Sequence, residues 1–363
     1  MRASQFVGFA ALASVLSAAA LSGCKKDAPA PSPAPAAEAQ AAPKLQRSDL
    51  TAFAALPVNF DSAANPGTDA KVALGQMLFH EKRLSKNQLL ACDSCHGLDT
   101  FGADGKPFSP GHKGQLGGRN SPTVLNAAGE FVQFWDGRAK DVEEQAKGPI
   151  LNPVEMAMAS SETVVATLKT IPGYVTAFQA AFPGEADAVT YDNLGKAIGA
   201  FERKLVTPSP WDKFLAGDDA ALSDEEKAGA QEFIATGCGG CHSGVLVGGA
   251  MFQKAGLVKA WPNQKDLGRF EVTKKDEDKL FFKVPSLRNI VKTAPYFHDG
   301  SAATLDVAIK TMAEHQLGKQ LSDAQVASIA KFLNALTGEL PAALKAVPKL
   351  PESTETTPKA VLD

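Results

Sequence analysis

The chain carries two copies of one short pattern, Cys-x-x-Cys-His, at Cys92–His96 and at Cys238–His242. Two thiols at this spacing can each bond to one vinyl group of the same porphyrin, and the adjacent histidine can bind the iron from one face. A zinc site would need further ligands close to each motif, and a thioredoxin-like redox pair would follow a strand and lack the histidine. The sequence therefore predicts two covalently attached c-type haems, held by Cys92, Cys95 and His96 and by Cys238, Cys241 and His242.

Length, charge and cysteine content limit the class of protein further. The chain has 363 residues, enough for two domains with hydrophobic cores. Its formal net charge of −3 gives no basic footprint, so we expect no nucleic-acid partner. Four of the five cysteines belong to the two motifs and the fifth is Cys24, which leaves no pair for a structural disulfide. Haem attachment of this type predicts a periplasmic or similar exported location.

The N-terminus supports export. A positive start at Met1-Arg2 and an apolar stretch from Phe6 to Leu21 predict a signal peptide over residues 1–23. The run Leu21-Ser22-Gly23-Cys24 resembles the lipobox of bacterial lipoproteins, which predicts a lipid on the Cys24 thiol and a membrane anchor. Lys25 after the cysteine suggests the outer membrane. The alternative is an ordinary secretory peptide that leaves a soluble protein with one free thiol.

An Ala/Pro-rich stretch over residues 24–48 predicts an extended tether, which reaches up to roughly 60 Å. After it the chain repeats one plan, because a helical stretch precedes each haem motif: Asp69 to Phe79, and a helix from Ser223 with Glu226 in a capping box. Each half closes with an amphipathic helix, the second after a Ser322/Gln325 capping box. The apolar faces are Leu194, Ala197, Ile198, Phe201 and Leu205, and Val326, Ile329, Ala330, Leu333 and Leu336.

These patterns predict a mostly α fold, with two cytochrome c-like haem domains in tandem that meet at an interface. The break at Thr207–Pro210 divides an N-terminal domain over 49–206 from a C-terminal domain over 207–346. The polar residues 347–363 predict a flexible tail.

The function of each haem depends on the ligand opposite its motif histidine. His112 lies in a glycine-rich loop after the first motif, where it is either a removable sixth ligand or a solvated side chain. For the second haem the candidates are Met251, Met312, His298 and His315. Met312 precedes the closing helix and can approach from the far side; its thioether would raise the reduction potential, although methionine is more often core filler.

Longer runs resemble bacterial di-haem cytochrome c peroxidases, within the superfamily related to MauG. They span about residues 50 to 340 and both haem motifs. The runs are Arg119–Asn126, Gln133–Arg138, Glu144–Pro149, Val284–Asn289, Pro295–Ser301 and Gln316–Gly318.

The resemblance implies unequal roles for the two haems. The haem on His96 would be the low-potential peroxidatic centre with His112 as its displaceable ligand, and the haem on His242 would be the high-potential centre with Met312 opposite. Trp135 would assist electron transfer between them. Glu155 would be the acid/base residue of the peroxide pocket, with Gln145 beside it. A calcium ion would be held by Asn120, Thr293 and Pro295, and the protein would be a homodimer.

The implied function is reduction of hydrogen peroxide to water, with electrons from a small cytochrome c or copper protein. Two alternatives remain open. A MauG-like enzyme oxidises residues on another protein, but that type has tyrosine where Met312 stands here. A non-enzymatic di-haem electron carrier would need neither Glu155 nor a labile His112. Without the resemblance, Trp135 would be assigned to interdomain packing and Glu155 to a helix start.

Overall fold

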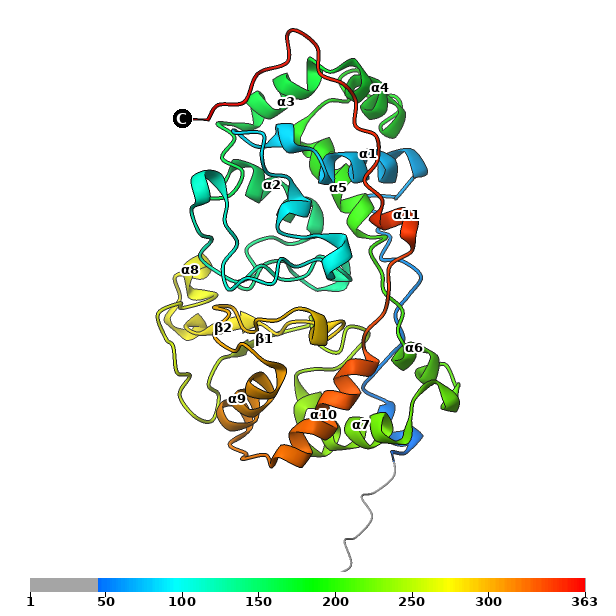
Figure 1. Cartoon of the computed structure of the whole chain (residues 1–363), viewed down its shortest axis with the longest axis vertical. Helices are drawn as coiled ribbons and strands as arrows, with labels where there is room; N and C mark the ends of the chain where they lie inside the picture. Colours follow the sequence, from blue (N-terminus) through cyan, green and yellow to red (C-terminus); the bar gives the residue numbers. More distant parts are fainter. Residues whose placement is uncertain (1–44, 363) are drawn as a thin grey trace, which may run out of the picture. The chain divides into compact units, whose positions relative to one another are not determined.

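The computed structural model describes residues 45–362 and shows a mostly helical chain (Figure 1). The predicted signal peptide, Cys24 and the tether up to residue 44 lie outside the described residues. We use the predicted boundaries as names, so residues 49–206 are the N-terminal half and residues 207–346 the C-terminal half. Within the described part, no helix is long and apolar enough to cross a membrane.

Helices dominate both halves, which confirms the predicted fold class. The two strands, β1 (Phe252–Lys254) and β2 (Phe281–Lys283), form one antiparallel pair with Phe252 opposite Lys283. The α-helices are α1 (Asp69–Phe79), α2 (Val142–Leu151), α3 (Ser161–Lys169), α4 (Pro172–Ala181), α5 (Tyr191–Glu202), α6 (Pro210–Leu215), α7 (Asp224–Thr236), α8 (Phe270–Thr273), α9 (Leu305–Leu317), α10 (Asp323–Ala335) and α11 (Ala342–Lys345).

The helix starts follow their sequence signals. Ser223 and Glu226 form a reciprocal capping box at the start of α7, and Ser322 and Gln325 do the same at α10, as predicted. The predicted helix over Asp69–Phe79 has these same bounds in the structure. Local side-chain hydrogen bonds thus determine where α7 and α10 begin.

Each half is built around one close helix pair, α1 with α5 and α7 with α10. A glycine stands at each crossing. A Cβ on Gly75 of α1 would lie 1.9 Å from the Ala197 carbonyl oxygen of α5, and one on Gly229 of α7 would lie 2.1 Å from the Ser328 carbonyl oxygen of α10. The two halves therefore use the same device to bring their helices together, as a tandem repeat of one domain plan would.

Separate apolar clusters surround these pairs. Leu194, Ala197 and Ile198 of α5 are fully buried against α1, α3 and α4, and Ile329 and Leu333 of α10 pack with the aromatic residues of α6 and α7. The predicted apolar faces of the two closing helices are thus core faces, except that Ala330 is only partly buried.

The N-terminal end of the described chain lies against the C-terminal half. Leu50, the last residue of the 3₁₀ helix η1 (Arg47–Leu50), belongs to the core that contains Trp211. The ring of Phe53 meets the edge of Trp211 with 5.6 Å between ring centroids, and the Gly244 N–H donates to the Ala52 carbonyl at 2.8 Å. Residues just after the predicted tether therefore contact the half that lies farther along the sequence.

The C-terminal residues 347–362 lie against the N-terminal half, and we call them the C-terminal strap (Figure 1). This differs from the flexible tail that the sequence predicts. The strap is held by hydrogen bonds from Arg83 to the Pro351 carbonyl (2.8 Å) and from Gln88 to the Pro358 carbonyl (2.9 Å). Three prolines limit its conformations and its threonines supply further hydrogen bonds, so a polar composition does not leave it loose.

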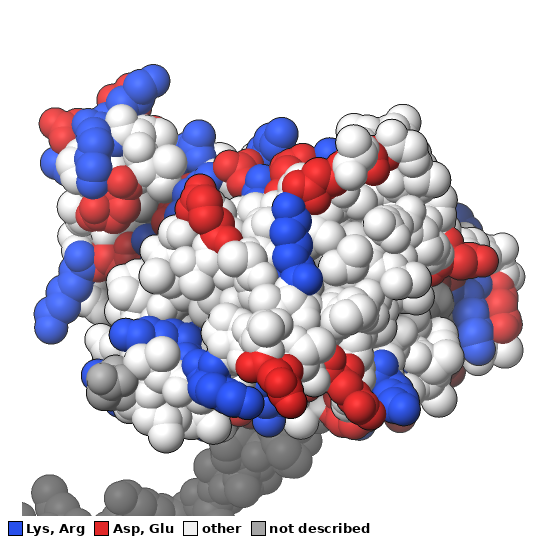
Figure 2. Space-filling model, turned by 90° about the horizontal axis from the view of Figure 1, so that it is seen from above, with Lys and Arg blue, Asp and Glu red and all other residues white. Residues whose placement is uncertain are grey.

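Charged side chains of both signs share the surface. Figure 2 shows lysines and arginines interspersed with carboxylates around a broad uncharged area of the face that it displays. This face therefore carries a mixture of positive and negative side chains and no large region of one sign.

Candidate haem-binding sites

The two Cys-x-x-Cys-His motifs fold into the same local structure. Each begins with a 3₁₀ turn, η3 (Cys92–Ser94) and η8 (Cys238–Gly240). In the first motif the His96 N–H donates to the Cys92 carbonyl at 2.9 Å, and in the second the His242 N–H donates to the Cys238 carbonyl at 3.0 Å. The four thiols are free. Two equivalent turns, each with a pair of unpaired thiols and a histidine, fit the covalent attachment of a porphyrin at both places.

The two motif histidines are oriented in the same way. His96 Nδ1 lies 3.1 Å from the Gly102 carbonyl oxygen, and His242 Nδ1 lies 3.3 Å from the Val247 carbonyl oxygen. A hydrogen bond at Nδ1 fixes the ring and leaves Nε2 as the metal-binding atom. Burial lowers the pKa of both histidines, to about 4 for His242, which keeps the imidazole neutral as metal coordination requires.

The C-terminal motif opens onto a largely apolar cavity. Cys238, Cys241 and His242 lie on its wall together with Met312 of α9. Apolar side chains from α7, α9 and α10 also line it: Phe233, Leu305, Ala308, Ile309, Ile329 and Leu333. A cavity with thiols and a histidine on its wall and a thioether among its lining fits the haem that the sequence predicts.

The structure separates the four candidates for the ligand opposite His242. Met312 and His298 line the cavity, whereas Met251 and His315 are absent from its lining. Met251 is partly exposed, and His315 Nδ1 is near the Lys259 carbonyl (3.2 Å) outside the lining. His298 is stacked on Phe282 with 4.1 Å between ring centroids. Two of the four candidates therefore line the cavity: Met312, which packs with Trp135 against its apolar wall, and His298, whose Nε2 is buried without a hydrogen-bond partner among the described residues.

His112 stands at the tip of a hairpin-like loop that Pro110 and Leu116 close through an isolated β-bridge. Its N–H lies 2.8 Å from the Glu155 carbonyl oxygen and 3.0 Å from that of Val154. A Cβ on Gly111 would lie 2.0 Å from the Val154 carbonyl oxygen, so only glycine allows this approach. The His112 ring is buried and its Nδ1 has no hydrogen-bond partner among the described residues. A buried, unpartnered imidazole nitrogen fits a ligand to the haem that the sequence predicts.

Glu155 is placed by the same backbone contact. Its Oε1 accepts a hydrogen bond from Asn152 Nδ2 at 2.9 Å. Burial raises the pKa of the Glu155 carboxyl, while the charge of Arg138 opposes the shift. The thiol of Cys95 also has a raised pKa, mainly through burial and partly through the charge of Glu155. The Glu155 backbone is therefore joined to His112, and the Glu155 charge acts on Cys95 of the first motif. Gln145 is half-buried on α2 without a side-chain hydrogen bond in the described part.

Trp135 connects the two halves. Its Nε1 donates to the Asn120 carbonyl at 2.9 Å, and its own carbonyl accepts from the Lys283 N–H at 2.8 Å. The indole lies on the cavity wall, as do Asn120 and the predicted calcium ligands Thr293 and Pro295. The structure thus places these four predicted residues on the wall of the same cavity.

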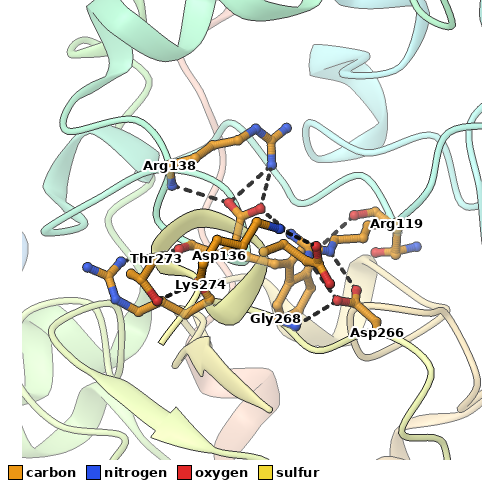
Figure 3. A network of polar contacts seen from close by, with 11 residues as sticks. Arg119, Asp136, Arg138, Asp266, Gly268, Thr273 and Lys274 are labelled. Atoms are coloured by element: carbon orange, nitrogen blue, oxygen red, sulfur yellow. Dashed lines mark hydrogen bonds and ion pairs between the residues drawn. The ribbon is translucent and has the colours of Figure 1, made fainter. Parts of the chain in front are cut away.

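An ion-pair network lies next to Trp135, and it was not predicted from the sequence. Arg119 binds Asp266 of the C-terminal half through Nε (2.6 Å) and Nη2 (2.8 Å), and binds Asp136 of its own half through Nη1 (2.6 Å) (Figure 3). Arg138 also reaches Asp136, at 3.1 Å. Arg119 and Asp136 stand in the runs that carry the family resemblance, but Asp266 is 147 residues from Arg119 and no local pattern joins them.

Comparisons with known proteins agree with this geometry. Residues 69–220 match the family described as di-haem cytochrome c peroxidase. Cytochrome c551 peroxidase of Pseudomonas aeruginosa is 47% identical over 300 residues, which cover 81% of this chain and 86% of that protein. Methylamine utilization protein MauG of Methylorubrum extorquens is 33% identical, with coverage of 79% and 83%. A solved MauG-like protein associated with microbial copper homeostasis superposes with a TM-score of 0.72 at 28% identity, over 81% of this chain and 97% of that one.

Two equivalent attachment turns in a tandem helical fold define a di-haem c-type cytochrome. The chain belongs to the di-haem cytochrome c peroxidase family, so the resemblance drawn from the sequence is confirmed.

Proposed function

We propose that this chain reduces hydrogen peroxide to water with electrons taken one at a time from a small cytochrome c or a small copper protein. The observation that carries the proposal is the unequal chemistry around two equivalent attachment turns. One turn is connected through the Glu155 segment to a buried, unpartnered histidine on a hairpin-like loop. The other turn faces a cavity lined by a methionine. The relatives named as cytochrome c peroxidases support the same activity.

Each half of the chain would hold one haem. Cys92, Cys95 and His96 would hold the peroxidatic group with His112 opposite, and Cys238, Cys241 and His242 would hold the electron-accepting group with Met312 opposite. When bound, the first haem supplies the iron that exchanges electrons with peroxide, and the second supplies a one-electron store whose potential the thioether ligand raises.

His112 controls access in this proposal. Peroxide would need the place that the His112 side chain takes as a ligand, so the ring would have to move away first. The backbone of His112 is held on both sides: its N–H donates to the Val154 and Glu155 carbonyls, and its carbonyl accepts from Gln115. The ring Nδ1 has no partner among the described residues. The side chain can therefore leave while the loop stays attached to the segment that carries Glu155.

Glu155 moves the proton. Its carboxyl lies near the first motif and is oriented by Asn152. From there it can take the proton from one oxygen of peroxide and return it to the other, which then leaves as water. Gln145 would help to orient the peroxide from α2.

Trp135 would assist electron transfer between the halves, since it contacts both through Asn120 and Lys283. Asn120, Thr293 and Pro295 would hold a calcium ion, because amide and carbonyl oxygens are ligands that Ca²⁺ prefers. Calcium removal with a chelator should then slow peroxide turnover without changing the haem content. Unchanged turnover after chelation would remove the ion from the proposal.

The finer assignments of location and assembly come from the sequence. We propose a periplasmic protein anchored by a lipid on Cys24, in the outer membrane, and a homodimer. Cys24→Ser should release the protein into the soluble periplasmic fraction. Persistent membrane association of that variant would contradict the lipid anchor.

Turnover tests the proposed function directly. Peroxide is added to the half-reduced protein together with a reduced small cytochrome, and oxidation of the cytochrome is followed by absorbance. We expect turnover well above the background without the protein. Absence of turnover would favour a non-enzymatic electron carrier.

A further inference from the structure

We infer that Glu130 and Lys283, an ion pair between the two halves, set the reduction potential of the C-terminal haem and tie its redox state to the interdomain contact. This inference rests on the proposed function, because it needs a haem on His242 that accepts the first electron. Glu130 follows the 3₁₀ turn η6 (Ala127–Gly129) of the N-terminal half, and Lys283 ends β2 of the C-terminal half. Neither residue was singled out by the sequence.

The pair lies in the wall of the C-terminal cavity. The Lys283 ammonium contacts a Glu130 carboxylate oxygen, and the exposed fractions of the two side chains are only 4% and 9%. Both residues line the same cavity as His242 and Met312. A haem in this cavity therefore has a carboxylate and an ammonium close to it, both largely shielded from water.

Glu130 also touches the segment that orients the motif histidine. A Cβ on Gly249 would lie 3.0 Å from Glu130 Cγ, so the side chain packs directly on this glycine. The neighbouring Phe131 N–H donates to the Gly249 carbonyl at 2.9 Å. Val247, two residues earlier, provides the carbonyl oxygen near His242 Nδ1. The N-terminal half thus reaches the loop behind His242 through Glu130.

Lys283 makes the return contact. Its backbone N–H donates to the Trp135 carbonyl at 2.8 Å, and the Trp135 indole donates to the Asn120 carbonyl. Asn120 lies on the segment that follows the His112 loop, and its N–H donates to the His298 carbonyl at 2.8 Å. The pair therefore stands where a change in the C-terminal cavity can alter the contact between the halves.

Simple electrostatics gives the sign of each effect. Reduction lowers the charge at the iron by one unit, so a nearby carboxylate favours the oxidised state and a nearby ammonium favours the reduced state. Such effects are strong where water is excluded. The same two charges form an ion pair between the halves. Reduction of the haem therefore changes the stability of this pair, and by linkage the interdomain contact must change the reduction potential in return.

The test measures potentials in the holoprotein by spectroelectrochemical titration of the C-terminal haem without peroxide. Glu130→Gln should shift the potential to a more positive value and Lys283→Met to a more negative one. The double variant should lie between the two, and Lys283→Arg, which keeps the charge, should stay near the wild type. The control is Lys310→Gln/Asp323→Asn, an exposed pair in the same half, which should leave the potential unchanged.

Potentials of Glu130→Gln and Lys283→Met that match the control would overturn the inference. A shift of both variants in the same direction would also overturn it, because that indicates a damaged pocket rather than a charge effect. Electron paramagnetic resonance of the half-reduced protein tests the tie to the interdomain contact, because release of His112 would make the N-terminal haem high-spin. In Lys283→Met the broken ion pair would no longer link the C-terminal haem to this contact, so we expect a smaller high-spin fraction. A wild-type fraction would refute the tie.

These results are independent of the proposed activity. Absence of peroxide turnover in the wild type would remove the proposed function but leave the potential shifts in place. Unchanged potentials with normal turnover would remove only the role of Glu130 and Lys283.

Discussion

At the scale of single residues, the structure joins His112 and Glu155 through the backbone. The His112 N–H reaches the Glu155 carbonyl, and Gly111 permits the approach because it has no Cβ. The proposed displaceable ligand and the proposed acid/base residue thus lie on two segments that this backbone contact joins. In the proposed mechanism the His112 ring would move away beside the segment that carries Glu155.

Glu155→Gln removes the acid/base group and keeps the shape of the side chain. We expect turnover to fall by roughly 10²-fold or more, since positioned general acid–base catalysis contributes about that much. Both haem spectra should stay as in the wild type. Glu162→Gln, an exposed carboxylate on α3, is the matched control and should leave the rate unchanged. Full activity of Glu155→Gln would mean that another group moves the proton.

Met312→His tests the assignment of the ligand opposite His242. Replacement of a thioether by an imidazole lowers a haem potential, so the C-terminal haem should become harder to reduce. Reductive activation, in which reduction of the C-terminal haem releases His112 in the other half, should then be lost. Met251→His, at a partly exposed position outside the cavity, is the control. If Met312→His leaves the potential of this haem unchanged, Met312 is not its ligand.

At the scale of elements, the glycine crossings are the feature that both halves share. The α7–α10 pair carries the second motif, because η8 follows directly after α7. A shift of α7 relative to α10 would therefore move Cys238 and His242 within their cavity. The stability of the α7–α10 pair and the geometry of the second haem motif therefore both depend on the close contact at Gly229.

Gly229→Ala places a methyl group 2.1 Å from the Ser328 carbonyl oxygen, where neither backbone can move cheaply. We expect the free energy of unfolding to fall by about 1–3 kcal/mol, which is typical of overpacking. Denaturant unfolding followed by circular dichroism measures this change. Gly118→Ala, at a position with open space around it, should change stability little. Equal stability of the two variants would show that the helices separate easily at this crossing.

The same scale shows what the sequence can predict. The helix caps at Ser223 and Ser322 and the apolar face that begins at Leu194 depend on residues only a few positions away. These features could therefore be predicted, and the structure confirms them. The ion pairs Arg119–Asp266 and Glu130–Lys283 join residues more than 140 positions apart. Their partners depend on how the halves meet, which no local periodicity encodes. His112 and Met312 could be named as ligand candidates, but only the fold shows that His112 is buried and that Met251 and His315, two alternatives to Met312, lie outside the cavity.

At the scale of the whole molecule, the two ends of the described chain cross between the halves. Leu50 packs in the C-terminal core, and the C-terminal strap lies along the N-terminal half. Through the Val361 N–H the strap binds the Lys86 carbonyl at 3.0 Å, and the Lys86 N–H binds the Met156 carbonyl at 2.9 Å. Met156 directly follows Glu155, so the strap supports the segment on which the proposed acid/base residue stands.

Removal of the C-terminal strap by a stop codon after Ala346 tests this support. The truncation deletes the partners of Arg83, Lys86, Gln88 and Thr170. Each net hydrogen bond contributes about 0.5–1.5 kcal/mol, with less at exposed positions, so we expect a lower melting temperature. Hydrogen exchange should become faster at the residues around Lys86. Slower turnover is expected as well, because the segment after Asn152 loses its outer contact.

A matched variant separates the strap's contacts from the length of the chain. Gln88→Asn shortens the side chain and loses the hydrogen bond to the Pro358 carbonyl, so it should reproduce part of the effect. Lys359→Ala, at an exposed position of the strap, should not. An unchanged melting temperature and unchanged exchange after truncation would mean that residues 347–362 are loose, as their composition alone predicts. The expected loss would instead show that a proline- and threonine-rich tail can hold an active-site segment in place.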